Sequence, residues 1–320
     1  MQLVRGLDNY QKEGRLQLAL GNFDGVHCGH QVLVKQAIIK ARKNNEKSGV
    51  LIFEPHPLKV LAPAMAPQML VNTSRKLELF AALGLDEVII AEFNLEVAKW
   101  SPQYFVEDIL LGKLGIGGAY VGFNYTFGHK GSGNAEMLAG YGKQKDFLVE
   151  IIPPVKIKDT IVSSTVIRSY MEAGDVDSAR QLLGYTPSLT GPVIEGEKRG
   201  RSIGFPTANI EPPADMLVPM TGVYAAMVKL QGSLYPAVLN IGKKPTFHKE
   251  YPLTIEAHLI NYQGDFYGQE VEVLLVKRLR SEMKFESVTK LTAQINQDTQ
   301  AAIQALKSWQ PSDLEQTWLG

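Results

Sequence analysis

Residues 16–30, LQLALGNFDGVHCGH, decide the fold class, because an apolar run passes into a glycine-containing turn and then into a helix pattern. The run LQLAL is typical of a strand buried between two layers of helices. After Gly29, an apolar stripe at i, i+4 spacing runs through Leu33, Ala37 and Ala41 and predicts a helix. A buried strand followed by a turn and a crossover helix is the unit of a parallel α/β sheet.

The first half of the chain repeats this unit. Further buried strands are predicted at 49–53, 87–92, 119–121 and 147–152, with helices at 76–83, 103–111, 165–173 and 176–183. Beyond the stretch YTPSLTGP at 185–192, strand patterns follow one another without helices, at 222–230, 235–241, 254–260 and 271–279. We therefore predict a Rossmann-like domain with a parallel sheet at 1–184. A small antiparallel β-barrel domain is predicted at 185–320, with a terminal helix capped by Ser287.

The composition is that of a globular protein with two domains. The 320 residues are 45% hydrophobic and 21% charged. Lys and Arg total 33, as do Asp and Glu, so no net field would attract a nucleic acid and none is expected as a partner. One cysteine and a start without a long apolar core favour the cytoplasm. No apolar run approaches the roughly 18 residues of a membrane helix, so no membrane span is expected, and a homo-oligomer is left open.

The turn after the first buried strand is the first candidate site. Ligands bind at the carboxyl ends of strands in open α/β sheets. Free N–H groups at a helix N-terminus bind anions, and two imidazoles on one turn can add donors to phosphate oxygens. The alternatives are a capped surface helix and, less favoured, a metal pair. The residues concerned are Gly21, Phe23, Asp24, Gly25, His27, Gly29 and His30.

The pattern HCGH at 27–30 resembles the H-x-G-H signature of nucleotidyltransferases that attack the α-phosphate of ATP. Extended to GNFDGVHCGHQ at 21–31, with FEPHP at 53–57 and VGFNYTFGHKGSG at 121–133, the chain resembles the adenylyltransferase domain of bacterial riboflavin kinase/FAD synthetases. The stretch SSTVIR at 163–168 is similar to that family's second nucleotide-binding signature, although an ordinary helix cap would look the same.

This resemblance implies roles for the first site. His27 and His30 would stabilise phosphates, and Arg168 would neutralise the departing pyrophosphate. The FMN phosphate is already a nucleophile, so positioning and charge neutralisation, with Mg²⁺ on ATP, would suffice. Asp24 would organise the turn and Asn124 would line the nucleotide or flavin pocket. The residues expected to contact ATP or flavin are Gly21, Phe23, Asp24, Gly25, Gly29, Asn124, Ser163, Ser164 and Thr165.

A second motif, GRSIGFPTANI at 200–210, follows the predicted domain boundary. Gly204 and Pro206 fix a turn, and Thr207 and Asn209 place side-chain oxygens on one face, as suits Mg²⁺. Threonine and asparagine are also common in ordinary turns, so this motif alone does not decide between a metal site and a turn.

The segments around this motif resemble riboflavin kinase. GVYAAMV at 222–228, NIGKKPTF at 240–247, IEAHLINYQGDFYG at 255–268 and LRSEMKFES at 279–287 follow in that family's order. The resemblance implies that Thr207 and Asn209 bind Mg²⁺ with ATP phosphates and that Glu256 is the general base for the ribityl hydroxyl. Gly200, Arg201, Gly204 and Pro206 would contact the nucleotide. Without this resemblance, Glu256 would be interpreted as a solvated residue on an edge strand.

The chain is identified as a member of the bifunctional riboflavin kinase/FMN adenylyltransferases, which implies flavin cofactor biosynthesis from ATP, riboflavin and FMN with Mg²⁺. One alternative is an enzyme that retains only one of the two activities, or an adenylyltransferase for another phosphorylated substrate. Another is a flavin-binding regulator that contacts RNA, against which the zero net charge and the candidate catalytic residues weigh.

Overall fold

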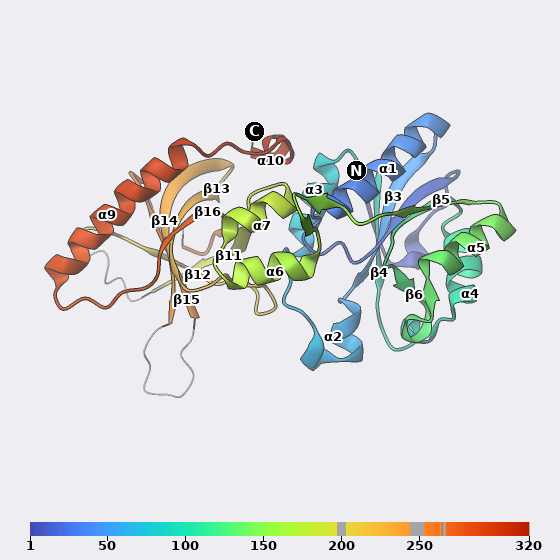
Figure 1. Cartoon of the computed structure of the whole chain (residues 1–320), viewed down its shortest axis with the longest axis horizontal. Coiled ribbons are helices and arrows are strands. Elements are labelled where there is room, and N and C mark those ends of the chain that lie inside the picture. Colours follow the sequence, from blue (N-terminus) through green and yellow to red (C-terminus); the bar gives the residue numbers. More distant parts are fainter. Residues whose placement is uncertain (197–202, 244–252, 263, 265–266, 320) are drawn as a thin grey trace. The chain divides into compact units, whose positions relative to one another are not determined.

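The computed structural model describes residues 1–196, 203–243, 253–262, 264 and 267–319. These residues divide into two compact units, one of Met1–Gln68 with Thr73–Val162 and one of Met69–Asn72 with Ser163–Gly320 (Figure 1). The short segment Met69–Asn72 belongs to the second unit, because the backbone of Met69 hydrogen-bonds to Asp215 and Leu217.

The first unit is built on a six-stranded sheet in the order β1-β4-β3-β2-β5-β8, and its strand pairs are parallel. Its strands are β1 (Gln2–Arg5), β2 (Leu16–Leu20), β3 (Lys47–Glu54), β4 (Glu87–Glu92), β5 (Ile116–Gly122) and β8 (Leu148–Ile152). The sequence pattern predicts all of these except β1. It does not predict β1 because Val4 is the one buried residue of this edge strand.

Helices cover both faces of this sheet. On one face, Leu16, Leu18 and Leu20 pack against apolar residues of η4 (Phe105–Lys113) and α5 (Ala135–Lys145). The alternate residues of β2 point to the opposite face, where α1 (Cys28–Asn44) contacts β2, β3 and β5. A parallel sheet buried on both faces explains why its strands are continuous apolar runs.

The other elements of the first unit are mostly short. They are η1 (Leu7–Asn9), α2 (Pro57–Leu61), η2 (Pro63–Met65), α3 (Thr73–Ala82), η3 (Val97–Lys99), α4 (Pro102–Tyr104), β6 (Thr126–Phe127), η5 (His129–Gly131), β7 (Gly133–Asn134), β9 (Lys156–Ile157) and β10 (Thr160–Ile161). The strands β6 and β7 form one antiparallel pair, and β9 and β10 form another. The helix predicted at 103–111 is present as α4 followed directly by η4.

The strand order changes direction at β2. From β2 the chain crosses to β3 and β4 on one side and later places β5 and β8 on the other. The carboxyl ends of β2 and β5 are therefore neighbours at a topological switch point, where open α/β sheets bind ligands. The turn at 21–27 follows β2 and Asn124 follows β5, so the sheet brings both predicted segments to this edge.

The second unit contains a closed antiparallel barrel in the order β11-β12-β15-β14-β13-β16. Its strands are β11 (Ser188–Ile194), β12 (Ala208–Ile210), β13 (Gly222–Leu230), β14 (Ser233–Lys243), β15 (Leu253–Leu259) and β16 (Glu270–Arg280). Together with the parallel sheet, this barrel confirms the predicted fold class. The pattern does not predict β11 or β12, because Pro192 interrupts the first and the second has only 3 residues.

Four helices of the described chain accompany the barrel: α6 (Ser164–Glu172), α7 (Val176–Leu183), α9 (Val288–Lys307) and α10 (Asp313–Leu319). As predicted, Ser287 caps α9, since its Oγ accepts a hydrogen bond from the Lys290 amide at 3.2 Å. This helix packs on β13, β14 and β16, and α7 packs on β16. Within the described ranges, no helix is both long enough and apolar enough to cross a membrane.

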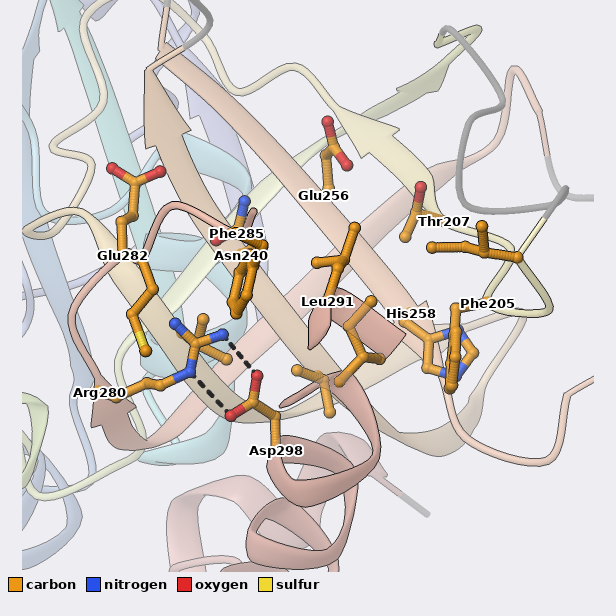
Figure 2. A pocket seen from close by; sticks show the side chains of 15 residues that line it. Phe205, Thr207, Asn240, Glu256, His258, Arg280, Glu282, Phe285, Leu291 and Asp298 are labelled. Atoms are coloured by element: carbon orange, nitrogen blue, oxygen red, sulfur yellow. Dashed lines mark hydrogen bonds and ion pairs between the residues drawn. The ribbon is translucent and has the colours of Figure 1, made fainter. Parts of the chain in front are cut away.

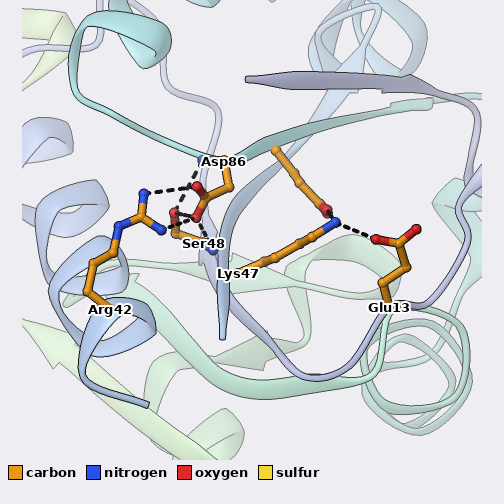
Figure 3. A network of polar contacts seen from close by, with 6 residues as sticks. Glu13, Arg42, Lys47, Ser48 and Asp86 are labelled. Atoms are coloured by element: carbon orange, nitrogen blue, oxygen red, sulfur yellow. Dashed lines mark hydrogen bonds and ion pairs between the residues drawn. The ribbon is translucent and has the colours of Figure 1, made fainter. Parts of the chain in front are cut away.

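A polar network ties together the amino ends of β3 and β4, at the sheet edge opposite the candidate site (Figure 3). Lys47 forms ion pairs with Glu13 and Glu87, each at 2.7 Å. Arg42 donates to both carboxylate oxygens of Asp86 at 2.8 and 2.9 Å. The amide and hydroxyl of Ser48 donate to Asp86 as well. Four donated hydrogen bonds make Asp86 the centre of this network.

Asp86→Asn is expected to lower the stability of the first unit by about 1–2 kcal/mol at pH 7, because the charge-assisted bonds from Arg42 are weakened. Burial alone would raise the pKa of Asp86, but the hydrogen bonds from Arg42 and Ser48 lower it below its usual 3.8. The stabilisation is therefore present above pH 3.8 and lost as the pH falls through the folded-state pKa. Amide hydrogen exchange in β3 and β4 would measure it, with Asp8→Asn as the exposed control, and equal protection in Asp86→Asn and the unchanged chain would contradict it.

Candidate active sites

The turn after β2 has a strained backbone. Phe23, Gly25 and Val26 have positive φ angles of 49°, 80° and 35°. Glycine adopts this left-handed region readily, whereas a β-branched residue such as valine does so only under constraint. Phe23 and Val26 are fully buried. Strain of about 1–3 kcal/mol per residue persists only where the surroundings enforce it, and such positions gather at functional sites.

His27 caps the helix that follows this turn. Its Nδ1 accepts a hydrogen bond from the His30 amide at 3.3 Å, so the proton of the neutral ring lies on Nε2. The rings of His27 and His30 stack with their centroids 3.6 Å apart and their planes 11° from parallel. A Cβ atom at Gly29 would come within 3.2 Å of the His27 ring. Glycine at this position therefore preserves the stacked pair.

His30 is held in its neutral form. Burial lowers the pKa of His30 well below its usual 6.5, and the neighbouring His27 and Lys76 lower it further. Its Nδ1 atom is buried and has no hydrogen-bond partner among the residues that the structure describes. The Phe23 ring packs against it with 5.2 Å between centroids. A neutral imidazole with an unsatisfied nitrogen is suited to a ligand that brings hydrogen-bonding atoms, such as a phosphate.

The thiol of Cys28, which lies between these histidines in the sequence, is not activated. Burial raises the pKa of the Cys28 thiol above its usual 9.0, and the thiol's own backbone amide and Lys35 offset this only in part. A raised pKa disfavours the thiolate, which is the nucleophilic form.

A lysine that the sequence reasoning misses also contacts this turn. Lys76 of α3 is 6% exposed, and its Nζ lies 3.4 Å from the carbonyl oxygen of Asn22. Asp24 is likewise buried, and its charge acts on Lys76. The sequence does contain a signal, because Lys76 shares one helical face with the apolar residues Leu79 and Phe80.

The remaining residues predicted for the first site are divided between the two units. Gly21 directly follows β2, and Asn124 is an exposed residue of the turn after β5. The segment 163–168 belongs to the second unit, where Ser163 caps α6 by accepting a hydrogen bond from the Val166 amide at 3.3 Å. Ser164, Thr165 and Arg168 lie in the first turns of that helix. Their contact with a nucleotide remains a prediction.

In the barrel, strand register builds a row of polar side chains. Asn209 of β12 lies opposite Glu256 of β15, and Glu256 lies opposite Asn240 of β14. Residues paired across antiparallel strands share one face, so these three side chains are neighbours. The sequence alone does not identify Asn240 as a site residue, because its position beside Glu256 depends on strand register. Thr207 stands two residues before Asn209 and thus projects to the same side.

The oxygen atoms of this row are available to a ligand. Asn209 is 9% exposed, and a Cβ atom at position 196 would lie 1.8 Å from its Nδ2, so Gly196 leaves the space that the amide fills. Outside the strand ladders, the side chains of Asn209 and Glu256 have no hydrogen bond or ion pair to another residue of the described chain. Among the described residues, no three His, Cys, Asp or Glu side chains are grouped so as to hold a metal ion. The hydroxyl of Thr207 and the amide oxygen of Asn209 are instead hard oxygen donors, as Mg²⁺ prefers.

A cavity of about 330 Å³ adjoins this row, between the barrel wall, the segment 281–287 and α9 (Figure 2). Ligand pockets commonly occupy about 300–1,000 Å³ and combine apolar walls with a few polar groups. The apolar lining comes from Ile203, Phe205, Val223, Val238, Met283, Phe285, Leu291 and Ile295. The polar lining comes from Thr207, Asn240, Glu256, His258, Arg280, Glu282 and Asp298.

Two contacts fix the walls of this cavity. The Nδ1 atom of His258 lies 2.9 Å from the Pro206 carbonyl oxygen, and Phe205 packs edge-on against the His258 ring, which attaches the turn at 203–207 to β15. Arg280 donates to both oxygens of Asp298 at 2.8 and 2.6 Å, which attaches α9 to β16 (Figure 2). Gly204, with φ +88°, lies in that turn, and Gly200 and Arg201 lie outside the described residues.

Comparison with known proteins assigns each unit to a family. A model of FAD synthetase matches residues 10–166 and a model of riboflavin kinase matches residues 183–306. Bifunctional riboflavin kinase/FMN adenylyltransferases from Listeria monocytogenes and Escherichia coli K12 are 38% and 35% identical to the chain. The first alignment covers 88% of this chain and 90% of the relative, and the second covers 93% and 96%.

The chain belongs to the bifunctional riboflavin kinase/FMN adenylyltransferase family. This confirms the family predicted from the sequence. A solved structure titled as a macrolide-efflux protein from Streptococcus pneumoniae is 30% identical, with a TM-score of 0.86, and covers 97% of this chain and 100% of its own. Both units of this chain therefore have counterparts in one solved chain.

Proposed function

We propose that this chain converts riboflavin to FAD in two ATP-dependent steps, with FMN formed at the barrel and adenylylated at the sheet edge. The observation that carries the proposal is that each compact unit holds its own set of chemically suited side chains. The first unit has the stacked His27–His30 pair at a topological switch point, and the second has the row Asn209, Glu256 and Asn240 beside a cavity. The family's two named activities match these two sites in chain order.

For adenylyl transfer, an oxygen of the FMN phosphate would attack the α-phosphorus of ATP. The bond from that phosphorus to the bridging oxygen breaks, and pyrophosphate leaves with its electron pair. The attacking phosphate needs no general base, so this chain supplies hydrogen-bond donors and positioning. His27 offers Nε2–H and the neutral His30 offers its ring N–H to phosphate oxygens. Arg168, Ser163, Ser164 and Thr165 are proposed to hold the remaining phosphate oxygens, with Asn124 at the pocket wall.

For kinase chemistry, the 5′-hydroxyl of the ribityl chain would attack the γ-phosphorus of ATP, and ADP leaves. Glu256 is proposed to accept the hydroxyl proton, because its carboxylate is partly exposed beside the cavity and is not engaged in the described chain. The aromatic and aliphatic wall formed by Phe205, Phe285 and Leu291 suits the flat flavin ring, while Asn240 can hydrogen-bond to the ribityl chain.

Thr207 and Asn209 are proposed to hold Mg²⁺ together with ATP oxygens. A bound Mg²⁺ supplies charge neutralisation and orientation of the phosphates. The donor set fits this ion, because Thr207, just before β12, and Asn209, within β12, both offer hard oxygens, and the Asn209 side chain has no competing partner among the described residues. Gly204 and Pro206 shape the turn that carries these donors, and Gly200 and Arg201 are proposed to cover the nucleotide.

Gly196→Ala tests the metal-site assignment. A Cβ atom at this position would meet Asn209 Nδ2 at 1.8 Å and would displace the amide. We expect riboflavin kinase activity to fall by about 10²-fold, since a displacement of about 1 Å has that effect in a positioned site. The Mg²⁺ dependence of the remaining activity should shift to higher concentrations. Gly140→Ala, in α5 with open space around it and an ordinary helical backbone, serves as the control. Unchanged Mg²⁺ dependence would contradict the assignment.

We propose a boundary between the catalytic domains at 184/185 and a cytoplasmic location. The proposed partners are small molecules, namely ATP, riboflavin and FMN, with no nucleic acid.

The test of the whole proposal is a chromatographic assay with riboflavin, ATP and Mg²⁺ that follows FMN and FAD with time. FAD formed from riboflavin supports both activities. FMN alone would limit the function to the kinase, and no conversion by folded protein would contradict the proposal.

A further inference from the structure

Lys76 lies in a buried position, where a charged ammonium group is energetically unfavourable. Its side chain is 6% exposed within α3, and burial lowers the pKa of its ammonium group from 10.5. Buried ammonium groups persist only when carboxylates or backbone carbonyls surround them. The two reactions proposed above assign no role to this ammonium group. The unfavourable desolvation of Lys76 therefore indicates a function that other contacts would have to support.

The groups around Lys76 connect it to the catalytic turn. Its Nζ lies 3.4 Å from the carbonyl oxygen of Asn22, and the carboxylates of Asp24 and Glu54 favour its charged form. Lys59 is the cation that opposes that form. Glu54 also accepts a hydrogen bond from the hydroxyl of Thr73, at the start of the helix that carries Lys76. The ammonium group therefore connects α3, the end of β3 and the start of the turn.

The same helix supports the turn by packing. Phe80, one turn after Lys76, contacts the Phe23 ring edge-on with 5.5 Å between centroids. Phe23 in turn packs against His30. The turn holds three left-handed residues, a conformation that its own local sequence does not favour. A fixed cation at Asn22 and Asp24, together with the Phe80 contact, supplies the external constraint that this backbone requires.

We propose that Lys76 is a positioning residue for adenylyl transfer: by holding the turn at 22–26, it sets the place of the His27–His30 pair. This inference rests on the proposed adenylyltransferase function. Lys76 acts through the turn and the histidines and does not itself contact ATP or FMN. Its removal should therefore lower the rate of the bound complex and leave substrate affinity nearly unchanged.

The test compares full-length Lys76→Met, His30→Ala and the double variant in the conversion of FMN to FAD. Methionine keeps the length and volume of the side chain and removes its charge. We expect kcat for FAD formation to fall by about 10²-fold, with KM for ATP and for FMN within about threefold of the unchanged chain. Residues that act through one another are not additive, so the double variant should be no slower than His30→Ala alone. Lys43→Met, on the exposed end of α1, is the control.

A raised KM with unchanged kcat would overturn the inference, because it would mean that Lys76 contacts a substrate. Multiplied losses in the double variant would also overturn it, since they would indicate that Lys76 and His30 act independently. If Lys76→Met fails to fold by circular dichroism, Lys76→Gln in the same assay decides. FAD formation by the unchanged chain together with full activity of Lys76→Met would reject this inference alone, whereas no FAD from the unchanged chain would reject the proposed function.

Discussion

His30→Ala is expected to reduce the rate of FAD formation from FMN by about 10²–10³-fold, the loss typical when one donor to a charged transition state is removed. The substitution removes the ring whose centroid lies 3.6 Å from that of His27 and whose buried Nδ1 has no partner among the described residues. His27 would keep its position as helix cap through the His30 backbone amide, which alanine retains. The loss should therefore lie in kcat, because binding through other parts of FMN is unaffected.

The kinase activity of the same variant provides an internal control. Glu256, Thr207 and Asn209 lie in the other compact unit, so FMN formation from riboflavin should continue at the rate of the unchanged chain. Lys43→Ala is the control variant, since Lys43 is exposed, lies in the first unit and is outside the quoted motifs. If FAD formation persists in His30→Ala, the histidine pair is not the adenylyl-transfer site. If both activities disappear, the two reactions share one site.

Glu256→Gln is expected to lower FMN formation from riboflavin by about 10³-fold, within the range attributed to a general base. Glutamine keeps the size of the side chain and its place opposite Asn209 and Asn240, but it cannot accept the proton of the ribityl hydroxyl. The barrel should remain folded, because the Glu256 carboxylate supports no ion pair in the described chain. The variant should still convert supplied FMN to FAD at full rate.

Glu270→Gln is the control for this second substitution. Glu270 is an exposed carboxylate at the start of β16, in the same barrel but outside the cavity that Glu256 lines. A kinase rate in Glu256→Gln equal to that of Glu270→Gln would show that Glu256 is not the base.

The sequence by itself determined the two architectures and the family. Continuous apolar runs such as LQLAL indicate strands that are buried on both faces of a parallel sheet. Strand patterns that follow one another without helices, such as the one that became β13, indicate the antiparallel barrel. These signals are local, since they depend on side-chain periodicity within a few residues. Motifs such as HCGH and PTAN are also local, so the candidate residues His27, His30, Thr207 and Asn209 could be named from the chain alone.

The tertiary structure decided which groups meet. Asn240 joins Glu256 only because β14 pairs with β15 in one register, and a shift of one residue would have turned it to the other face. Lys76 reaches Asn22 across 54 positions of the chain, and Gly196 matters only because the amide of Asn209 folds against it. Long-range contacts of this kind depend on how separate elements pack. Sequence periodicity reports which face of an element is buried, but not which side chain it meets there.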